Sequence, residues 1–159
     1  LLLGPVTAVL ALNIYRQRQL LKEYFFPVLA GCFTGCLTSL GSILLLCKLL
    51  SVDSVIASSL LPKSVTTAIA VAISDSNGGI QGITVTAVLV AGVIGAIFAP
   101  LFAKLFRVTD PVAEGVAIGA CSHALGTSKA MEIGALQGAM SSIALCVCGI
   151  MTSIIIMFF

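Results

Sequence analysis

Four ionisable side chains lie in stretches of this sequence that are otherwise almost entirely apolar: Lys63, His123, Lys129 and Glu132. An unpaired charge at bilayer depth costs at least about 3 kcal/mol, so such groups are paired, reach the interface or face water. Two interpretations are open for the lysines. Their long side chains reach the headgroup region, or their ammonium groups bind an anion.

The anion interpretation is favoured by position. Each lysine lies beside a predicted helix start, where free N–H groups and the positive end of the helix dipole attract negative charge. Hydroxyl side chains lie close to both lysines, and a small carboxylate fits such a site. The predicted substrate-binding residues are Lys63, Ser64, Thr66, Thr67, Ser122, His123, Thr127, Ser128 and Lys129.

Other roles remain open for the second group of residues. Lys129 and Glu132 are three positions apart, so they can form a structural ion pair. His123 is either a packed core histidine or a proton-coupling group, with Glu132 as the second coupling candidate. One imidazole beside Cys121 offers too few ligands for a metal. Ser122 precedes His123 without a placed acid or oxyanion loop, so we expect no enzyme activity and no cofactor.

The composition sets the environment of these side chains. Hydrophobic residues make up 59% of the 159-residue chain and charged residues 9%, whereas globular domains are about a quarter charged. A mean hydropathy of +1.20 leaves more apolar surface than a core of this size can bury, so we expect a lipid bilayer around the chain. A net charge of +2 without a basic stripe excludes nucleic acid as a partner. The six cysteines lie in apolar stretches and are expected to be free, buried thiols.

Several apolar windows are long enough to cross a bilayer about 30 Å thick. A positive cluster of Arg16, Arg18 and Lys22 follows the first window, and the positive-inside tendency makes this loop cytoplasmic. The chain has no initiator Met and opens within an apolar run, so we expect it to be the C-terminal part of a longer protein. The predicted spans are 1–15, 25–47, 83–103 and 138–159.

Two further segments, 53–79 and 110–134, are apolar but interrupted. In the first segment, Pro62 predicts a break in the helix near Leu61. In the second, Gly126 predicts a helix end, and Thr127 a new start. We therefore expect an all-α, polytopic membrane helix bundle with two re-entrant or discontinuous helical segments.

The two interrupted segments share a layout. Lys48 and Asp53 precede the first break, and Lys104 and Asp110 precede the second; Asp110 is also predicted to cap a helix opened by Pro111. Interrupted apolar segments at matching positions are typical of transporters built from inverted repeats. If each segment re-enters and returns to its own side, the loop containing Lys104 becomes cytoplasmic, as positive charges prefer.

Small-residue spacing adds a packing prediction. Glycines four positions apart allow membrane helices to approach closely, and we expect contacts within the bundle before a homo-oligomer interface. The glycines are Gly31, Gly35, Gly115, Gly119, Gly134 and Gly138.

The stretches LLPKSVTTAIAVAIS and DPVAEGVAIGACSHALGTSKAMEIG resemble the LrgB family, also called CidB/LrgB, as does GPVTAVLALNIYRQ near the start. The resemblance covers nearly the whole chain, which is therefore expected to form a single LrgB-like transmembrane domain. The chain departs from the family pattern at Asn13 and Ala68, where Pro is usual, and at Val71 and Ala72, where Met-Glu is usual. The missing carboxylate at Ala72 weakens any mechanism that needs an acid in the first broken segment.

The resemblance implies two functions. Bacterial members are described as antiholin-like modulators of murein hydrolase activity and autolysis, acting with an LrgA-type membrane partner. Plastid relatives are taken to move glycolate and glycerate, and bacterial pairs are linked to pyruvate uptake. The broken helices with basic residues favour a carrier of small monocarboxylates in a cell membrane, or in a plastid inner envelope for a plant protein. A regulatory oligomer controlling autolysin export is the alternative.

Overall fold

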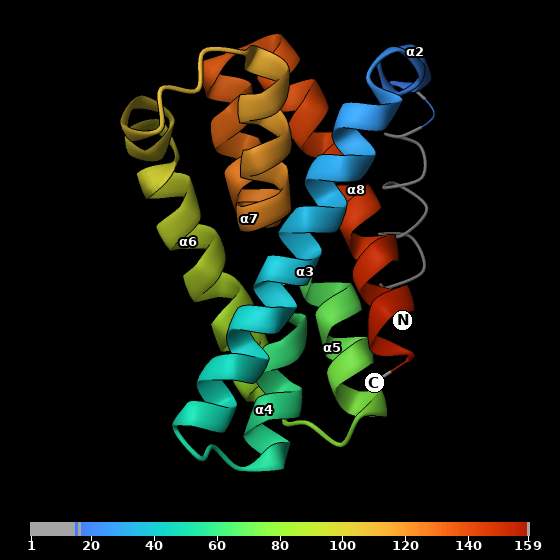
Figure 1. Cartoon of the computed structure of the whole chain (residues 1–159), viewed down its shortest axis with the longest axis vertical. Coiled ribbons are helices and arrows are strands. Elements are labelled where there is room, and N and C mark those ends of the chain that lie inside the picture. Colours follow the sequence, from blue (N-terminus) through green and yellow to red (C-terminus); the bar gives the residue numbers. More distant parts are fainter. Residues whose placement is uncertain (1–14, 16, 159) are drawn as a thin grey trace.

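The computed structural model describes residue 15 and residues 17–158, so the predicted span 1–15 lies almost entirely outside the described residues. The described part is helical throughout, without strands, which confirms the predicted all-α membrane bundle (Figure 1). Its elements are α2 (Arg18–Glu23), α3 (Phe25–Leu49), α4 (Ser54–Leu60), the 3₁₀ turn η1 (Leu61–Ser64), α5 (Thr67–Ser76), α6 (Gln81–Leu105), α7 (Pro111–Ile133) and α8 (Ala135–Ile156).

Three helices of the described part are long and apolar enough to cross a membrane: α3, α6 and α8, with 25, 25 and 22 residues. At 1.5 Å per residue each exceeds the roughly 30 Å of a bilayer core. In Figure 1 they run between the two ends of the bundle, and α6 runs opposite to α3 and α8. Arg18, Lys22, Lys104 and Arg107 lie at one end, here called the basic end, and the loop after α3 lies at the opposite end.

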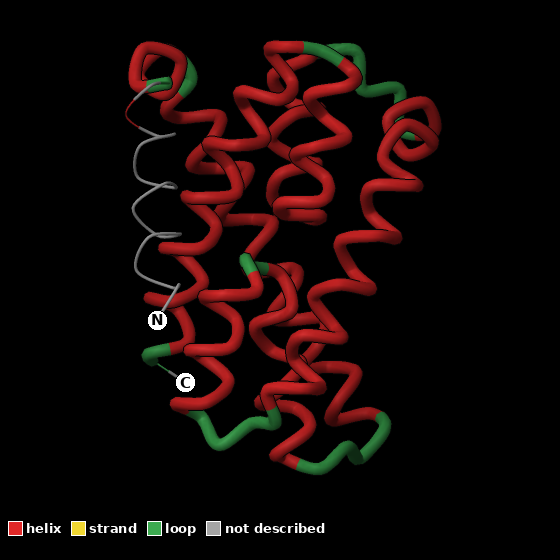
Figure 2. Tube along the Cα trace, turned by 180° about the vertical axis from the view of Figure 1, so that it is seen from behind, coloured by secondary structure: helices red, strands yellow, loops and turns green. Residues whose placement is uncertain are grey.

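The first interrupted segment forms a re-entrant hairpin from α4, η1 and α5, here called the first hairpin. It enters from the end opposite the basic end, turns at mid-height and returns (Figure 1). The turn begins at Pro62, whose backbone is not helical, and continues through an extended Val65. Figure 2 shows this break as a short loop near the middle of the bundle, far from the loops at both ends. Pro62 thus breaks the helix where the sequence predicts.

A buried hydroxyl cluster holds the base of the first hairpin to α6. The Thr84 hydroxyl lies 2.9 Å from the Ser59 carbonyl oxygen and 2.7 Å from the Ser74 hydroxyl. The Ile80 amide donates to the Ser59 hydroxyl at 2.7 Å. Since Ser59 is in α4 and Ser74 is in α5, Thr84 connects both arms of the hairpin to the next crossing helix.

We expect Thr84→Val to destabilise the protein by about 1–3 kcal/mol, because it leaves buried partners without their hydrogen bonds. Thr86→Val is the matched control: Thr86 is exposed on the same helix, and its hydroxyl bonds only the Gly82 carbonyl of its own helix. The midpoint of thermal unfolding in detergent measures both effects. Equal midpoints for the two variants would contradict a structural role for the cluster.

The second interrupted segment, α7, is also a re-entrant hairpin, here called the second hairpin, but its turn differs from the predicted one. The backbone reverses at His123 (φ 48°, ψ −134°), so the arms are residues 111–122 and 124–133. Ile118 and Ala130, from the two arms, pack together in one cluster with Ala99 of α6. Figure 1 shows α7 descending from the basic end to mid-height and returning.

The predicted helix end at Gly126 and restart at Thr127 are wrong, for a physical reason. Gly126 lies buried within the second arm, where an added Cβ would collide with the Cβ of Ser122 and would lie 3.0 Å from Ile118 Cγ2. The missing side chain lets the two arms approach closely, and it does not terminate a helix. Thr127 continues the same arm, with its hydroxyl 2.8 Å from the His123 carbonyl oxygen.

The two halves of the described chain repeat one plan in opposite orientations. α3 and α6 have the same length, and each is followed by a hairpin that enters from the end where that helix finishes (Figure 1). Their final turns match in detail: Ser51 (φ 50°) and Arg107 (φ 52°) adopt the left-handed conformation. The next amides, of Val52 and Val108, bond the Cys47 and Ala103 carbonyls, both at 2.9 Å. These are the inverted repeats that the sequence predicts.

The glycines predicted to pack helices lie at close contacts, with one difference. A Cβ on Gly31 or Gly35 would lie 3.1 Å from Val116 or 3.5 Å from Ala120, respectively, so these glycines face the second hairpin. Gly115, Gly119 and Gly138 allow α7 and α8 to touch, because added Cβ atoms would collide with Gln137, Ser141 and Met131. Gly134 instead forms the junction between α7 and α8.

Thiols contribute to the core between α3 and α8. The Cys32 sulfur of α3 lies 3.8 Å from the Ala144 carbonyl oxygen, and the Cys36 sulfur lies 3.8 Å from the Cys148 carbonyl oxygen. Five of the six cysteines are buried, as predicted. The prediction is wrong for Cys121, which is exposed.

Candidate functional site

The turns of the two hairpins meet at the centre of the bundle. The first tip, residues 61–66, belongs to the hairpin from one end, and the second tip, residues 122–124, belongs to the hairpin from the other. η1 contacts α7 directly, and Lys63 is within electrostatic range of Cys121 and His123. Two segments about sixty residues apart in sequence therefore join at mid-depth.

Lys63 is the cation of this junction. Its ammonium group lies 3.3 Å from the Ser64 hydroxyl, and Ser64 in turn contacts the hydroxyl of Ser39 on α3. Among the residues that the structure describes, no carboxylate forms an ion pair with Lys63. A partly buried ammonium without a counter-ion attracts an anion.

Unpartnered polar atoms lie on both tips. Within the part of the chain that the structure describes, the buried Thr66 Oγ1 of the first tip has no hydrogen-bond partner, and neither has either ring nitrogen of His123 in the second. The His123 side chain is only 2% exposed. Buried polar groups normally find partners, so orphaned groups from two elements at one junction indicate a site that a polar ligand completes.

The backbone adds positive potential at the same place. α5 begins at Thr67, directly after the first tip, and Thr66 precedes it without a side-chain cap on the helix. The second arm of α7 begins directly after His123. The N-termini of both helices therefore start at the junction, and such ends carry free N–H groups and a partial positive charge. Lys63, two helix N-termini and the hydroxyl of Thr66 together suit a small anion.

Not all predicted site residues reach this junction. Ser122 is buried against α6, where it lies next to Gly95. The hydroxyl of Thr127 is 2.8 Å from that of Ser141 on α8, so it holds the second hairpin to α8. Ser128 is exposed, and its hydroxyl bonds the Ala124 carbonyl of its own arm.

Lys129 and Glu132 form a pair of their own. The ammonium of Lys129 lies 2.8 Å from the Glu132 carboxylate, and the two side chains are 39% and 68% exposed. Lys129 lies six residues after the turn, roughly 9 Å along the helix. This is the ion-pair alternative of the sequence analysis, and it leaves Lys63 as the cation at the tips.

Ser39 and Cys121 are at the junction but were missed by sequence reasoning. Ser39 lies in the middle of a crossing helix, and only the fold brings it to Ser64. Cys121 precedes the second tip and resembles the other thiols in its apolar sequence context. A turn predicted at His123 would also have indicated Cys121, which lies two residues before it.

Comparison with known proteins identifies the family to which this bundle belongs. The family profile described as the LrgB-like family matches residues 1–159, the whole chain. The chain belongs to the LrgB-like family. This LrgB-like chain is 39% identical over 154 residues to the antiholin-like protein LrgB of Bacillus subtilis (strain 168), covering 97% of this chain and 67% of that relative.

Two other relatives of this LrgB-like chain are equally similar. The antiholin-like LrgB proteins of Bacillus mycoides (strain KBAB4) and Bacillus cereus (strain B4264) are each 39% identical over 157 residues, covering 99% of this chain and 68% of each relative. No solved structure matches. The apolar crossing helices and the family together define an LrgB-like membrane protein.

Proposed function

We propose that this LrgB-like chain carries small monocarboxylates of the pyruvate, glycolate or glycerate class across the membrane. The observation behind this proposal is the junction of two oppositely oriented re-entrant tips. Among the described residues, Lys63 has no counter-ion there and the ring nitrogens of His123 have no hydrogen-bond partner. Broken helices that meet at mid-depth are how inverted-repeat transporters build substrate sites.

A carboxylate fits the groups that the junction offers. Lys63 supplies the charge, Ser64 and Thr66 supply hydroxyl donors, and the imidazole of His123 donates from one ring nitrogen to a second substrate oxygen. In this assignment Thr67 contributes its backbone amide at the helix start. Ser122 and Thr127 position the second tip, whereas Ser128, Lys129 and Glu132 lie outside the binding site.

The charge distribution supports an orientation in the cell membrane. The basic end carries Arg18, Lys22, Lys104 and Arg107, whereas only Lys48 among the basic residues described lies at the opposite end, beside Asp53. By the positive-inside rule the basic end is cytoplasmic. For a plant protein, the proposed location is the plastid inner envelope instead of the cell membrane.

A second candidate function is regulation of murein hydrolases. Its support is the name antiholin-like protein, which the Bacillus relatives carry. In this alternative the chain acts with an LrgA-type membrane partner or as a homo-oligomer, and effects on autolysis do not require the junction of the tips.

Uptake measurements separate the two candidates. The full-length LrgB-like protein is reconstituted into liposomes with and without an LrgA-type partner, and labelled pyruvate and glycolate are added under an imposed pH or sodium gradient. Saturable uptake by the wild-type protein, competed by unlabelled acid, is the expected result. Folded protein that takes up neither acid under any gradient would favour the regulatory function.

A further inference from the structure

A cavity of about 460 Å³ lies between α6 and the first arm of the second hairpin. Its inner end is formed by Cys121 and by Ser122, the first residue of the second tip, and its outer end by Phe106 and Val108 at the basic end. It therefore extends along half the depth of the bundle, from the end of α6 to the junction of the tips.

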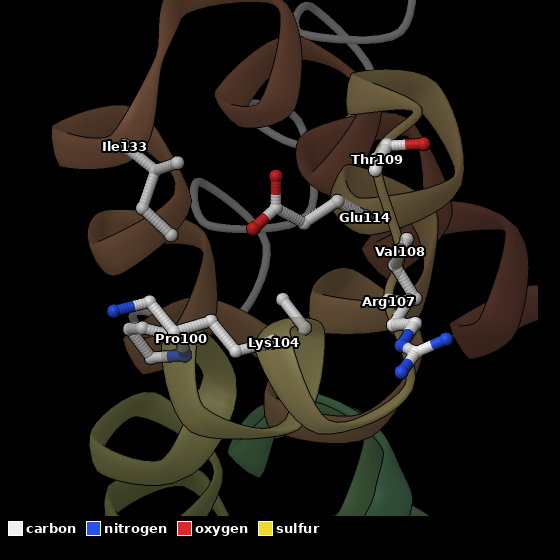
Figure 3. Close-up of a pocket in the computed structure, with 8 residues that line it drawn as sticks. Pro100, Lys104, Arg107, Val108, Thr109, Glu114 and Ile133 are labelled. Carbon is white, nitrogen blue, oxygen red and sulfur yellow. The ribbon is translucent and has the colours of Figure 1, made fainter.

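A second cavity, of about 530 Å³, lies next to the first at the basic end. The two share Ala103, Val108 and Glu114 in their walls. Figure 3 shows the carboxylate of Glu114 pointing into this outer cavity and the guanidinium of Arg107 along its edge, with Lys104 also in the wall. Two cations and one carboxylate leave the mouth net positive, which favours entry of anions.

Small side chains of α6 line the inner cavity. Gly95, Ala99 and Ala103 are four positions apart on α6, so they lie on one helix face, and all three line the cavity. Ala117 and Ile118 form the facing wall on the first arm. Among the described lining residues, Glu114 near the mouth is the one charged side chain, and Cys121 and Ser122 supply the polar groups at the inner end.

The corresponding positions of the first repeat carry larger side chains. When α3 is aligned with α6 by their ends, Ser39, Ile43 and Cys47 correspond to Gly95, Ala99 and Ala103. Ile43 and Cys47 are buried, at 5% and 8% exposed, and Ser39 contacts Ser64 of the first tip. The face of α3 thus carries larger side chains than the face of α6 that lines the cavity, although Ala99 is itself buried, at 9% exposed.

We infer that the cavity between α6 and the first arm of α7 is the path along which the carboxylate passes between the basic end and the tips. This inference rests on the proposed function and adds to it an access route, a mouth at Lys104 and Arg107, and a conformation facing the basic end. The equivalent face of α3 opens when the protein faces the other side.

The native thiol of Cys121 allows a direct test in the full-length protein. A small, charged, membrane-impermeant methanethiosulfonate is added to inside-out or right-side-out vesicles, and the Cys121→Ser variant identifies the Cys121 adduct. We expect labelling from the cytoplasmic face, slowed by pyruvate. Labelling only from the opposite face, or only by a lipid-soluble maleimide, would overturn the path; the second result would identify a cavity for lipid chains.

A second experiment fills the cavity with a larger side chain. Ala117→Phe places a ring in the cavity from an exposed position, and we expect it to slow both Cys121 labelling and pyruvate uptake by roughly tenfold, the equivalent of about 1.4 kcal/mol. Ala113→Phe is the matched control, because Ala113 is exposed on the same arm one turn earlier and lines neither cavity. We expect wild-type rates from it.

The outcomes distinguish the path from the carrier. Suppose that wild-type protein takes up pyruvate and that Ala117→Phe takes it up at the same rate as Ala113→Phe. The proposed carrier function is then supported, and the inferred access path is wrong. If wild-type protein takes up neither pyruvate nor glycolate, the proposed function fails, and the carboxylate path fails with it, whatever the labelling pattern.

Discussion

Lys63→Ala is expected to lower the efficiency of pyruvate uptake by at least about thirtyfold, because removing one partner of a buried, hydrogen-bonded charge pair costs about 2–5 kcal/mol. The ammonium of Lys63 has no counter-ion among the described residues and lies at the tip junction. Its loss leaves a carboxylate substrate with hydroxyl, amide and imidazole donors but no ammonium group. Initial uptake rates over a range of pyruvate concentrations in proteoliposomes measure the effect.

Lys129→Ala is the matched control for this experiment. It removes the same charge from the second hairpin, but Lys129 is 39% exposed and already paired with Glu132. Exposed pairs of this kind contribute about 1 kcal/mol at most, so uptake and thermal stability are expected to stay near wild type. A loss of uptake in Lys129→Ala equal to that in Lys63→Ala would move the anion site to the second arm. Wild-type uptake by both variants would remove the lysines from the mechanism.

His123→Gly is expected to abolish uptake and yet to be more stable than His123→Ala. Both substitutions remove the buried imidazole and leave the same space, but only glycine adopts the backbone of residue 123, φ 48° and ψ −134°, without strain. A non-glycine residue in such a conformation costs about 1–3 kcal/mol. For a chain of this size that difference corresponds to roughly 2–12 °C in the midpoint of thermal unfolding.

The two readouts of the His123 experiment test separate claims. Thermal unfolding in detergent compares the glycine and alanine variants and reports on the turn alone. Pyruvate uptake compares both variants with wild type and reports on the imidazole. Equal stability of the two variants would contradict a strained turn at residue 123, and substantial uptake by either would show that the ring nitrogens do not contact the substrate.

The first tip could be predicted from the sequence, and the second could not, because their turns use different chemistry. Proline lacks a backbone donor and disfavours helix in the preceding residue, so Pro62 marks its break without any tertiary information. His123 has no such local preference. It is held at positive φ by packing of the two arms, and the nearby Gly126, which has the expected composition of a helix end, serves that packing instead.

The contacts of the site also differ in how far the sequence predicts them. The pair of Lys129 and Glu132 follows from helical spacing and could be anticipated as an alternative. The contact of Ser39 with Ser64 joins two elements that no periodicity connects. The hydroxyl cluster around Thr84 likewise depends on how α4, α5 and α6 come together. Sequence thus supplied the charged residues and the crossing helices, while their assembly determined which ones meet.

The matching turns at Ser51 and Arg107 bear on how such a protein arises. They close two helices of equal length that point in opposite directions, each followed by its own hairpin. A single ancestral unit of one helix and one hairpin, inserted in both orientations and paired with itself, produces this arrangement after gene duplication and fusion. Lys48 and Lys104 occupy equivalent positions at the ends of α3 and α6, whereas Arg107 of the second copy stands where the first copy has Ser51.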